Sequence, residues 1–256
     1  MSFTLNKTKA SDDFTYPLAQ IKIKNKWNDI YFNYDTDIGI SEIKGEIRRK
    51  CYVEKNQRHT YFISGQSGSG KSTQASDIIK GLHKIDKNDW FLITNNSTID
   101  PKLDIPYVHR WTVDEIYDNQ LSEHDLVDDL GSLNIVLDDF DNHPDKLINK
   151  YIFDFVKIIL ENTRKLGTQI IYITHDARKG MVTKDINKEA TCYVLPMNDL
   201  LEIKKILKDK IGLNKGKEVN ALLDSIPKGR YTFLNIMRLP VPIVLVEGKK
   251  GMIKLI

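Results

Sequence analysis

The sequence predicts an α/β fold, with a central and mostly parallel sheet flanked by helices and short additions at both termini. Short apolar runs, rich in β-branched and aromatic residues, alternate with segments whose apolar residues recur at helical spacing. A glycine-rich loop joins one such run, residues 60–63, to a predicted helix at residues 73–82. Another apolar run, residues 133–137, ends in consecutive aspartates. Alternation of this kind is typical of strands in a parallel sheet.

The composition is that of an ordinary globular protein, because 41% of the 256 residues are hydrophobic and 29% are charged. No stretch approaches the roughly 20 apolar residues of a membrane-spanning helix, so we expect no membrane association. The net charge of +3 is too small to indicate nucleic-acid binding by itself. The two cysteines suggest neither a disulfide framework nor a metal site, which favours a reducing compartment.

The glycine-rich loop matches the pattern G-x-x-x-x-G-K-[ST] from Gly65 to Ser72. Glycines let the backbone curl with its N–H groups pointing inward, and the helix that follows adds its positive dipole end. We expect Lys71 to reach the β- and γ-phosphates of a nucleotide and Ser72 to ligate Mg²⁺. The alternative is a Gly/Ser-rich turn with an unrelated lysine. The expected nucleotide-binding residues are Gly65, Gln66, Ser67, Gly68, Ser69, Gly70, Lys71, Ser72 and Thr73.

Acidic residues follow the apolar run at 133–137, at the end of a predicted buried strand. Because the carboxyl ends of parallel strands meet at one edge of a sheet, these carboxylates are expected near the phosphate-binding loop. Asp138 would hold Mg²⁺ and Asp139 would polarise the attacking water. Asp141 could share that work, so the division of roles stays open. The alternative is an acidic loop after an ordinary strand.

A further buried strand, residues 169–173, ends in Thr174 and His175. Because this strand would end at the same edge of the sheet, we expect both side chains beside the γ-phosphate. Either could take part in catalysis by sensing the γ-phosphate through a hydrogen bond. The alternative is that His175 has a purely structural role.

The rest of the chain is interpreted from its periodicity. Residues 21–24 and 30–34 suggest strands joined by a turn at 28–29. Residues 38–53 suggest a solvated basic helix, and the alternative is a surface that faces a nucleic acid. Further strands are expected at 89–94, 107–111, 190–195, 230–236, 241–246 and 252–256. Further helices are expected at 113–119 with Thr112 as N-cap, and at 145–165, 198–211 and 217–226. The expected division is a lead-in of residues 1–57 and a domain of residues 58–256.

Together these motifs resemble the FtsK–HerA superfamily of P-loop ATPases, and most of all the DNA-packaging ATPases of double-jelly-roll DNA viruses and virophages. The resemblance is carried by residues 65–72 (Walker A), 134–140 (Walker B) and 162–175. The family commonly ends the last of these strands in a glutamine, where this chain has Thr174 and His175. No Leu-Ser-Gly-Gly signature of ABC-type ATPases lies between the two Walker motifs.

The resemblance implies a RecA-like P-loop NTPase fold and a homo-oligomeric ring, hexameric or pentameric, with ATP at the subunit interfaces. An arginine from a neighbouring subunit would complete each site. Arg164 is the first candidate, although it could simply be a cation at a helix C-terminus, and Arg178 and Arg230 are the others. Double-stranded DNA would be held at its phosphates, without sequence readout, by lysines such as Lys102 or Lys179.

The function that the resemblance implies is ATP-driven translocation of DNA into a viral capsid. A capsid vertex protein would be the partner, and the location would be the host cytoplasm, a viral factory or the virion. Two other functions stay open. One is a nucleotide-dependent switch or assembly factor acting on a protein partner, and the other is a small-molecule kinase with residues 178–188 as its lid.

Overall fold

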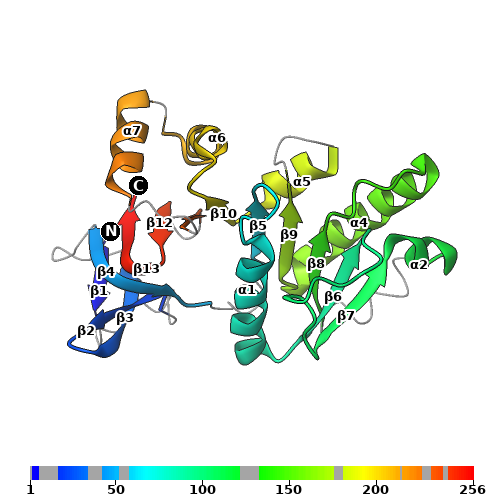
Figure 1. Cartoon of the computed structure of the whole chain (residues 1–256), viewed down its shortest axis with the longest axis horizontal. Coiled ribbons are helices and arrows are strands. Elements are labelled where there is room, and N and C mark those ends of the chain that lie inside the picture. Colours follow the sequence, from blue (N-terminus) through cyan, green and yellow to red (C-terminus); the bar gives the residue numbers. More distant parts are fainter. Residues whose placement is uncertain are drawn as a thin grey trace. The chain divides into compact units, whose positions relative to one another are not determined.

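The computed structural model describes residues 2–5, 17–33, 42–51, 58–121, 133–175, 181–213, 215–226, 232–238 and 242–256. The chain divides into two compact units, which Figure 1 draws with their elements labelled. One unit is Val53–Thr191, and the other combines Met1–Tyr52 with Cys192–Ile256. This division differs from the expected one, because the C-terminal segments join the N-terminal strands and not the phosphate-loop domain.

The Val53–Thr191 unit is built on a parallel sheet with the strand order β5, β9, β8, β6, β7. The strands are β5 (Thr60–Ser64), β9 (Ile170–Thr174), β8 (Leu133–Asp138), β6 (Asp89–Thr94) and β7 (Val108–Thr112). Both β5 and β9 are buried at every position, as expected for parallel strands covered on two faces. The expectation of a parallel sheet is therefore confirmed for this unit.

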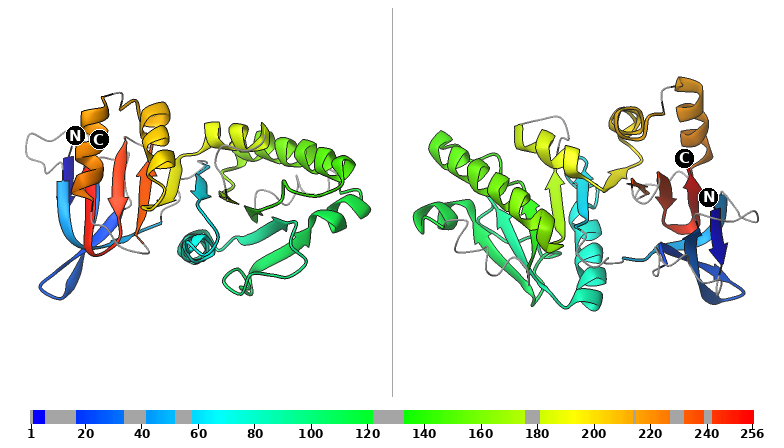
Figure 2. Two further views of the ribbon diagram at one scale, coloured as in Figure 1. Left: turned by 45° about the horizontal axis from the view of Figure 1, so that its top comes forward. Right: turned by 180° about the vertical axis from the view of Figure 1, so that it is seen from behind.

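Helices cover this sheet on both faces (Figure 2). They are α1 (Lys71–Asp86), α2 (Val113–Asp118), α4 (Lys146–Leu166) and α5 (Met181–Glu189). Helix α1 connects β5 to β6 in one direction along the sheet, and α4 connects β8 to β9 in the opposite direction. Because crossover connections are right-handed, this reversal puts α1 and α4 on opposite faces. The residues at helical spacing in both sequences are the buried ones, Ala75, Ile78, Ile79 and Leu82 in α1 and Ile152, Phe155, Val156 and Ile159 in α4.

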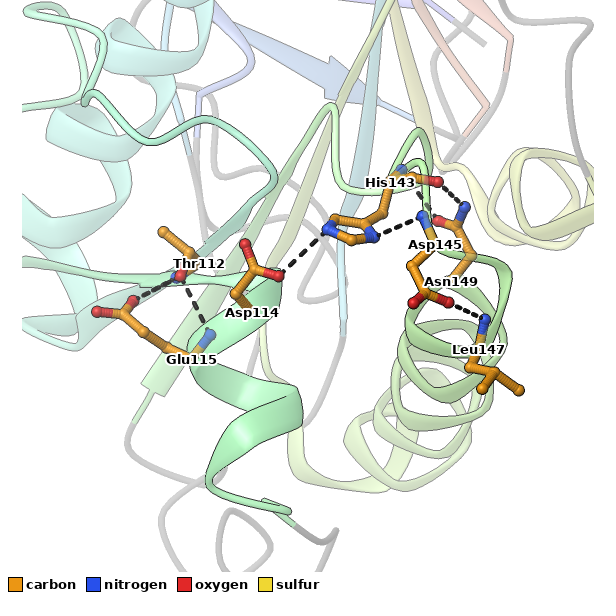
Figure 3. Close-up of polar contacts among 7 residues, drawn as sticks. All are labelled: Thr112, Asp114, Glu115, His143, Asp145, Leu147 and Asn149. Atoms are coloured by element: carbon orange, nitrogen blue, oxygen red, sulfur yellow. Dashed lines mark hydrogen bonds and ion pairs between the residues drawn. The ribbon is translucent and has the colours of Figure 1, made fainter.

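Helix α2 begins with the expected capping box (Figure 3). The Thr112 hydroxyl oxygen accepts a hydrogen bond from the Glu115 N–H at 3.2 Å, and the Glu115 carboxylate accepts one from the Thr112 N–H at 2.7 Å. These contacts satisfy two backbone donors that would otherwise lack a partner at the start of the helix. The hydrogen bond from Thr112 also lowers the pKa of the Glu115 carboxyl.

Thr112→Ala should lower the free energy of unfolding by about 1 kcal/mol, because it removes the side-chain acceptor at the N-cap. Urea denaturation of the variant and the wild type measures the difference. Thr112→Ser keeps the hydroxyl and is the matched control, so it should lose less than about 0.5 kcal/mol. Equal losses in the two variants would show that the methyl group, and not the cap, accounts for the effect.

The loop that follows β8 is tied to two helix N-termini by His143 (Figure 3). The Nδ1 atom of His143 accepts a hydrogen bond from the Asp145 N–H at 3.1 Å, and its Nε2 lies 3.2 Å from the Asp114 carboxylate in α2. Asp145 in turn caps α4 by accepting from the Leu147 N–H at 2.7 Å. These contacts hold the segment directly after the acidic strand end in one conformation.

His59 lies just before β5 and is only 5% exposed, and burial lowers its pKa to about 4. The unfolded chain, with a histidine pKa of about 6.5, binds more protons between about pH 4 and 6.5 than the folded one does. The stability contributed by neutral His59 is therefore complete above this window and is lost as the pH falls through it.

We expect acidification from about pH 7 to about pH 4 to cost the wild type about 2–3 kcal/mol more unfolding free energy than it costs His59→Gln. Urea denaturation at a series of pH values measures this. His109→Gln, at an exposed histidine, is the control and should follow the wild type. Parallel pH profiles for wild type and His59→Gln would contradict the expected linkage.

The second unit is built on an antiparallel sheet with the strand order β1, β3, β2, β4, β13, β12, β11, β10. The strands are β1 (Ser2–Leu5), β3 (Lys26–Asn33), β2 (Ala19–Ile23), β4 (Glu42–Arg49), β13 (Gly248–Leu255), β12 (Ile243–Val246), β11 (Phe233–Met237) and β10 (Cys192–Pro196). The unit also contains the helices α6 (Leu200–Ile211) and α7 (Gly216–Ser225). Strand β4 pairs with β13, and this pairing joins the two ends of the chain in one sheet.

The prediction of a basic helix at residues 38–53 is wrong, because residues 42–49 form strand β4. The buried residues Ile43 and Ile47 suggested a helix through their spacing of four. A spacing of four also equals two strand repeats, so both residues point to the same face of a strand. The periodicity alone could not separate the two structures.

The turn expected at residues 28–29 is also wrong. Asn28 and Asp29 lie within β3 and pair with Ile21 and Gln20 of β2. The turn is formed by residues 24–25, which both have positive φ angles, of 47° and 64°. Positive φ at both central residues is the geometry of a two-residue type I′ hairpin.

Among the described residues, no helix combines the length and the apolar character that crossing a membrane requires.

Candidate active site

A cavity of about 510 Å³ opens at the carboxyl edge of the parallel sheet. The phosphate-binding loop, the residues after β6, the acidic end of β8 and the end of β9 all contribute to its lining. Six of the expected nucleotide-binding residues line it directly, namely Ser67, Gly68, Gly70, Lys71, Ser72 and Thr73. The fold therefore brings together motifs that are far apart in the sequence.

The loop has the backbone geometry of an anion-binding site. Gly68 and Gly70 have φ angles of 74° and 100°, which favour glycine. A Cβ atom at Gly68 would meet nothing within 4 Å, so its conformation, and not crowding, accounts for the glycine. Helix α1 begins at Lys71 with Gly70 as N-cap and without a side-chain cap. The first N–H groups of α1 are thus left to bind a ligand at its positive end.

The Lys71 ammonium group lies at the base of the loop. It donates hydrogen bonds to the carbonyl oxygens of Gly65 at 2.8 Å and Gln66 at 3.3 Å. The residue is 7% exposed. Burial lowers its pKa, while the carboxylates of Asp139 and Asp138 act in the opposite direction. Two backbone carbonyls therefore fix the position of a partly desolvated cation.

His175 connects this lysine to the acidic end of β8. Its Nδ1 lies 3.2 Å from the Lys71 Nζ, and its Nε2 lies 3.0 Å from the Asp139 carboxylate. An ammonium group can only donate, so Nδ1 must be the acceptor in this arrangement. The ring proton then belongs to Nε2, which donates to Asp139. His175 is thus oriented by a cation on one side and an anion on the other.

Asp138 and Asp139 lie at the turn that ends β8, and both line the cavity. Asp139 has a φ of 46°, which a residue with a Cβ rarely adopts. Burial, together with the charges of Asp139 and Asp100, raises the pKa of Asp138 to about 7, and the charge of Lys71 acts in the opposite direction. The Lys71 ammonium therefore does not fully compensate the burial of the Asp138 carboxylate.

The chemistry of this donor set fits Mg²⁺. The Ser72 hydroxyl and the Asp138 carboxylate both line the cavity, and hard oxygen ligands are those that Mg²⁺ prefers. A divalent cation would also add positive charge beside the Asp138 carboxylate, which Lys71 compensates only in part. The described residues contain no group of three His, Cys, Asp or Glu that could hold a metal ion alone. A site with few protein ligands is usual for Mg²⁺, which keeps several waters and binds substrate phosphates.

The sequence did not identify the loop after β6 as part of the site. Asn96, Thr98, Asp100 and Lys102 of this loop line the cavity. The Arg110 guanidinium holds the loop by donating to the carbonyl oxygens of residues 96 and 97, at 3.2 and 2.9 Å. The only available signal was topological, since β6 pairs with β8 and its carboxyl end reaches the same edge. Lys102, expected to contact DNA, thus lies in this cavity.

Of the expected residues, Gly65, Gln66 and Ser69 of the loop lie outside the cavity lining, and so do Thr174 and Asp141. Thr174 is buried at the end of β9, and its carbonyl oxygen accepts a hydrogen bond from the Gly65 N–H at 3.3 Å. It holds the loop against the neighbouring strand. The Asp141 carboxylate accepts a hydrogen bond from the Tyr172 hydroxyl at 3.3 Å. His175 and Asp139 thus line the cavity, whereas Thr174 and Asp141 do not.

The arginine expected to act between subunits falls outside what can be described. Arg164 lies in α4, but its side chain is not among the described parts of the structure. Arg178, Lys179 and Arg230 also lie outside the described residues.

Comparison with known proteins gives one relative by sequence and several by structure. No family model matches the chain. The uncharacterized protein V3 of Sputnik virophage is 29% identical over 236 residues, which cover 90% of this chain and 92% of that protein. The pCW3 conjugation coupling protein TcpA, solved with ATPγS, gives a TM-score of 0.51 at 12% identity, over 93% of this chain and 78% of that one.

The genome packaging NTPase B204 of Sulfolobus turreted icosahedral virus 2, solved with sulfate, is a further structural neighbour. Its TM-score is 0.47 at 14% identity, over 75% of this chain and 96% of that chain. The strand order, the geometry of the glycine loop and the structural similarity to TcpA all indicate the same fold. This chain has the α/β fold of a P-loop NTPase.

Proposed function

We propose that this protein is an ATP-hydrolysing motor that translocates double-stranded DNA into a viral capsid. The observation that carries the proposal is the cavity at the glycine loop and the N-terminus of α1. Lys71, Ser72, Asp138 and Asp139 all line this cavity. The motif resemblance to packaging ATPases supports the choice of DNA as the cargo. A relative of nearly equal length in a virophage supports a viral setting.

Binding of ATP would follow from the loop geometry. The N–H groups of the loop and of the first turn of α1 would bind the β- and γ-phosphates. The Lys71 ammonium would exchange its contact with His175 for a phosphate oxygen and keep its two carbonyl partners. Ser72 and Asp138 would hold Mg²⁺, which supplies charge neutralisation on the phosphates when it is bound.

Hydrolysis would depend on Asp139 and His175. Asp139 would accept a hydrogen bond from the attacking water and align it with the γ-phosphorus. His175, hydrogen-bonded to Asp139, would hold the carboxylate in place. Loss of the γ-phosphate would return Lys71 to His175 and so reverse the contacts made on binding. His175 would then report the state of the nucleotide to the end of β9.

The proposal extends to the assembly. The active form would be a homo-oligomeric ring, a hexamer or pentamer, in which Arg164, Arg178 or Arg230 of a neighbouring subunit approaches the phosphates. A capsid vertex protein would anchor the ring. The protein would act in the host cytoplasm, in a viral factory or at the virion.

ATP turnover with and without double-stranded DNA, on protein whose mass in solution is known, tests this function. We expect an oligomer whose turnover rises when DNA is added. An oligomer whose rate of ATP turnover is the same with and without DNA would contradict the proposed motor function. Slow turnover that responds to a protein partner and not to DNA would instead favour a nucleotide-dependent switch.

A further inference from the structure

The positive charge of this chain is concentrated in one of its two units. The antiparallel unit, Met1–Tyr52 with Cys192–Ile256, contains 21 lysines and arginines against 13 aspartates and glutamates, a net charge of +8. The parallel-sheet unit, Val53–Thr191, contains 17 against 22, a net charge of −5. The small net charge of the whole chain is therefore the sum of a basic unit and an acidic unit. A basic surface is the electrostatic requirement for binding a nucleic acid.

A groove of about 410 Å³ lies on the basic unit. Lys44 of β4 and Lys249 and Lys250 of β13 line it, on two strands that lie side by side (Figure 1). Ser225, at the end of α7, lines it as well. No acidic residue belongs to its described lining. The groove therefore combines a polar hydroxyl with three cations.

A β-bulge presents the two consecutive lysines. Between Gly248 and Gly251, strand β13 has one residue more than the facing part of β4. Residues of a regular strand alternate between the two faces, and a bulge breaks this alternation. Lys249 and Lys250 are accordingly both exposed, and no ion pair of either is found among the described residues. Lys44 shares Glu42 with Lys254, at 2.5 and 3.3 Å.

Two glycines, Gly45 and Gly251, also line the groove. Gly45 and Gly251 face each other across β4 and β13. A Cβ atom at Gly251 would lie 2.7 Å from the Val246 carbonyl oxygen and 2.8 Å from the Ile47 Cβ, so packing requires glycine there. A Cβ atom at Gly45 would likewise lie 2.9 Å from the Ile21 Cδ1, so both glycines serve the packing of the two strands that carry the lysines.

We infer that this groove binds the phosphate backbone of double-stranded DNA, an inference that rests on the motor function proposed above. Lysines are compact charges on flexible stems, so they bind phosphates without requiring a base sequence. The surface is separate from the nucleotide cavity, which is where Lys102 lies. The residues that contact DNA are thus Lys44, Lys249 and Lys250 of the antiparallel unit, and not residues of the parallel-sheet unit.

The test compares two double variants of the full-length protein that remove the same charge from the same unit. Lys249→Gln with Lys250→Gln removes the groove lysines, and Lys204→Gln with Lys205→Gln removes two exposed lysines of α6. Binding to a short fluorescent duplex of mixed sequence is measured by anisotropy over a range of salt concentrations. We expect the groove variant to bind about 10-fold or more weakly, with a salt slope reduced by about 2, and the α6 variant to stay near the wild type.

The outcomes separate this inference from the proposed function. Equal losses in the two double variants would show that only the net charge of the unit matters, and this would overturn the groove assignment. A wild type that binds DNA as tightly as the groove variant would overturn it too, while leaving the motor intact. A wild type that does not bind DNA at all would overturn both. Thermal unfolding of each variant checks that the hairpin carrying Lys249 and Lys250 is undisturbed.

Discussion

Lys71→Ala should lower kcat/KM for ATP hydrolysis by about 100- to 1,000-fold, because it removes the buried cation that is placed to bind the transferring phosphoryl group. A direct binding measurement with an ATP analogue should show weaker affinity as well, since the same ammonium contacts the phosphates before reaction. A phosphate-release assay measures turnover, and calorimetry measures binding.

The matched control for this variant is Lys80→Ala, which removes an exposed lysine from the same helix. It should retain the turnover of the wild type. Because Lys71 donates to two backbone carbonyls, thermal unfolding of both variants is needed to separate lost folding from lost chemistry. Wild-type turnover in a folded Lys71→Ala protein would contradict the assignment of the phosphate site.

Asp139→Asn should lower kcat by about 100- to 10,000-fold while nucleotide affinity changes little. The amide oxygen can still accept the hydrogen bond from the Nε2 of His175, so the geometry of the side chain is kept. What is lost is the negative charge that polarises the attacking water. Single-turnover kinetics and nucleotide binding, measured on the same preparation, separate the two effects.

Asp141→Asn is the control for this substitution, since the carboxylate of Asp141 contacts the Tyr172 hydroxyl and lies outside the described lining of the cavity. It should keep most of the turnover. If Asp141→Asn lost as much activity as Asp139→Asn, the two carboxylates would share the catalytic work and the geometric distinction would be wrong.

The parts of the site that could be predicted are those coded by local spacing. The glycine loop from Gly65 to Ser72 specifies its own conformation, because positive φ angles and a helix N-terminus are local properties. The aspartates after β8 could be placed beside the loop because parallel strands share one edge. The buried face of α4 followed from its helical period in the same way.

The parts that could not be predicted depend on contacts between distant residues. The pairing of β4 with β13 joins segments about 200 residues apart, and no local pattern specifies such a partner. The loop after β6 carries no motif, so Asp100 could be placed in the cavity only once β6 was known to pair with β8. Asp139 and Asp141 follow the same strand, and only the structure shows that Asp139 lines the cavity while Asp141 accepts a hydrogen bond from the Tyr172 hydroxyl.

The most direct test of the central claim is a crystal structure of the protein with Mg²⁺ and a non-hydrolysable ATP analogue. We expect the β- and γ-phosphates to lie in the loop between Gly65 and Ser72, with the Lys71 ammonium on the γ-phosphate and no longer on His175. Asp138 and Asp139 should face the ion and the γ-phosphate. Nucleotide bound elsewhere with this loop empty, or both carboxylates turned away from the ion, would contradict the claim.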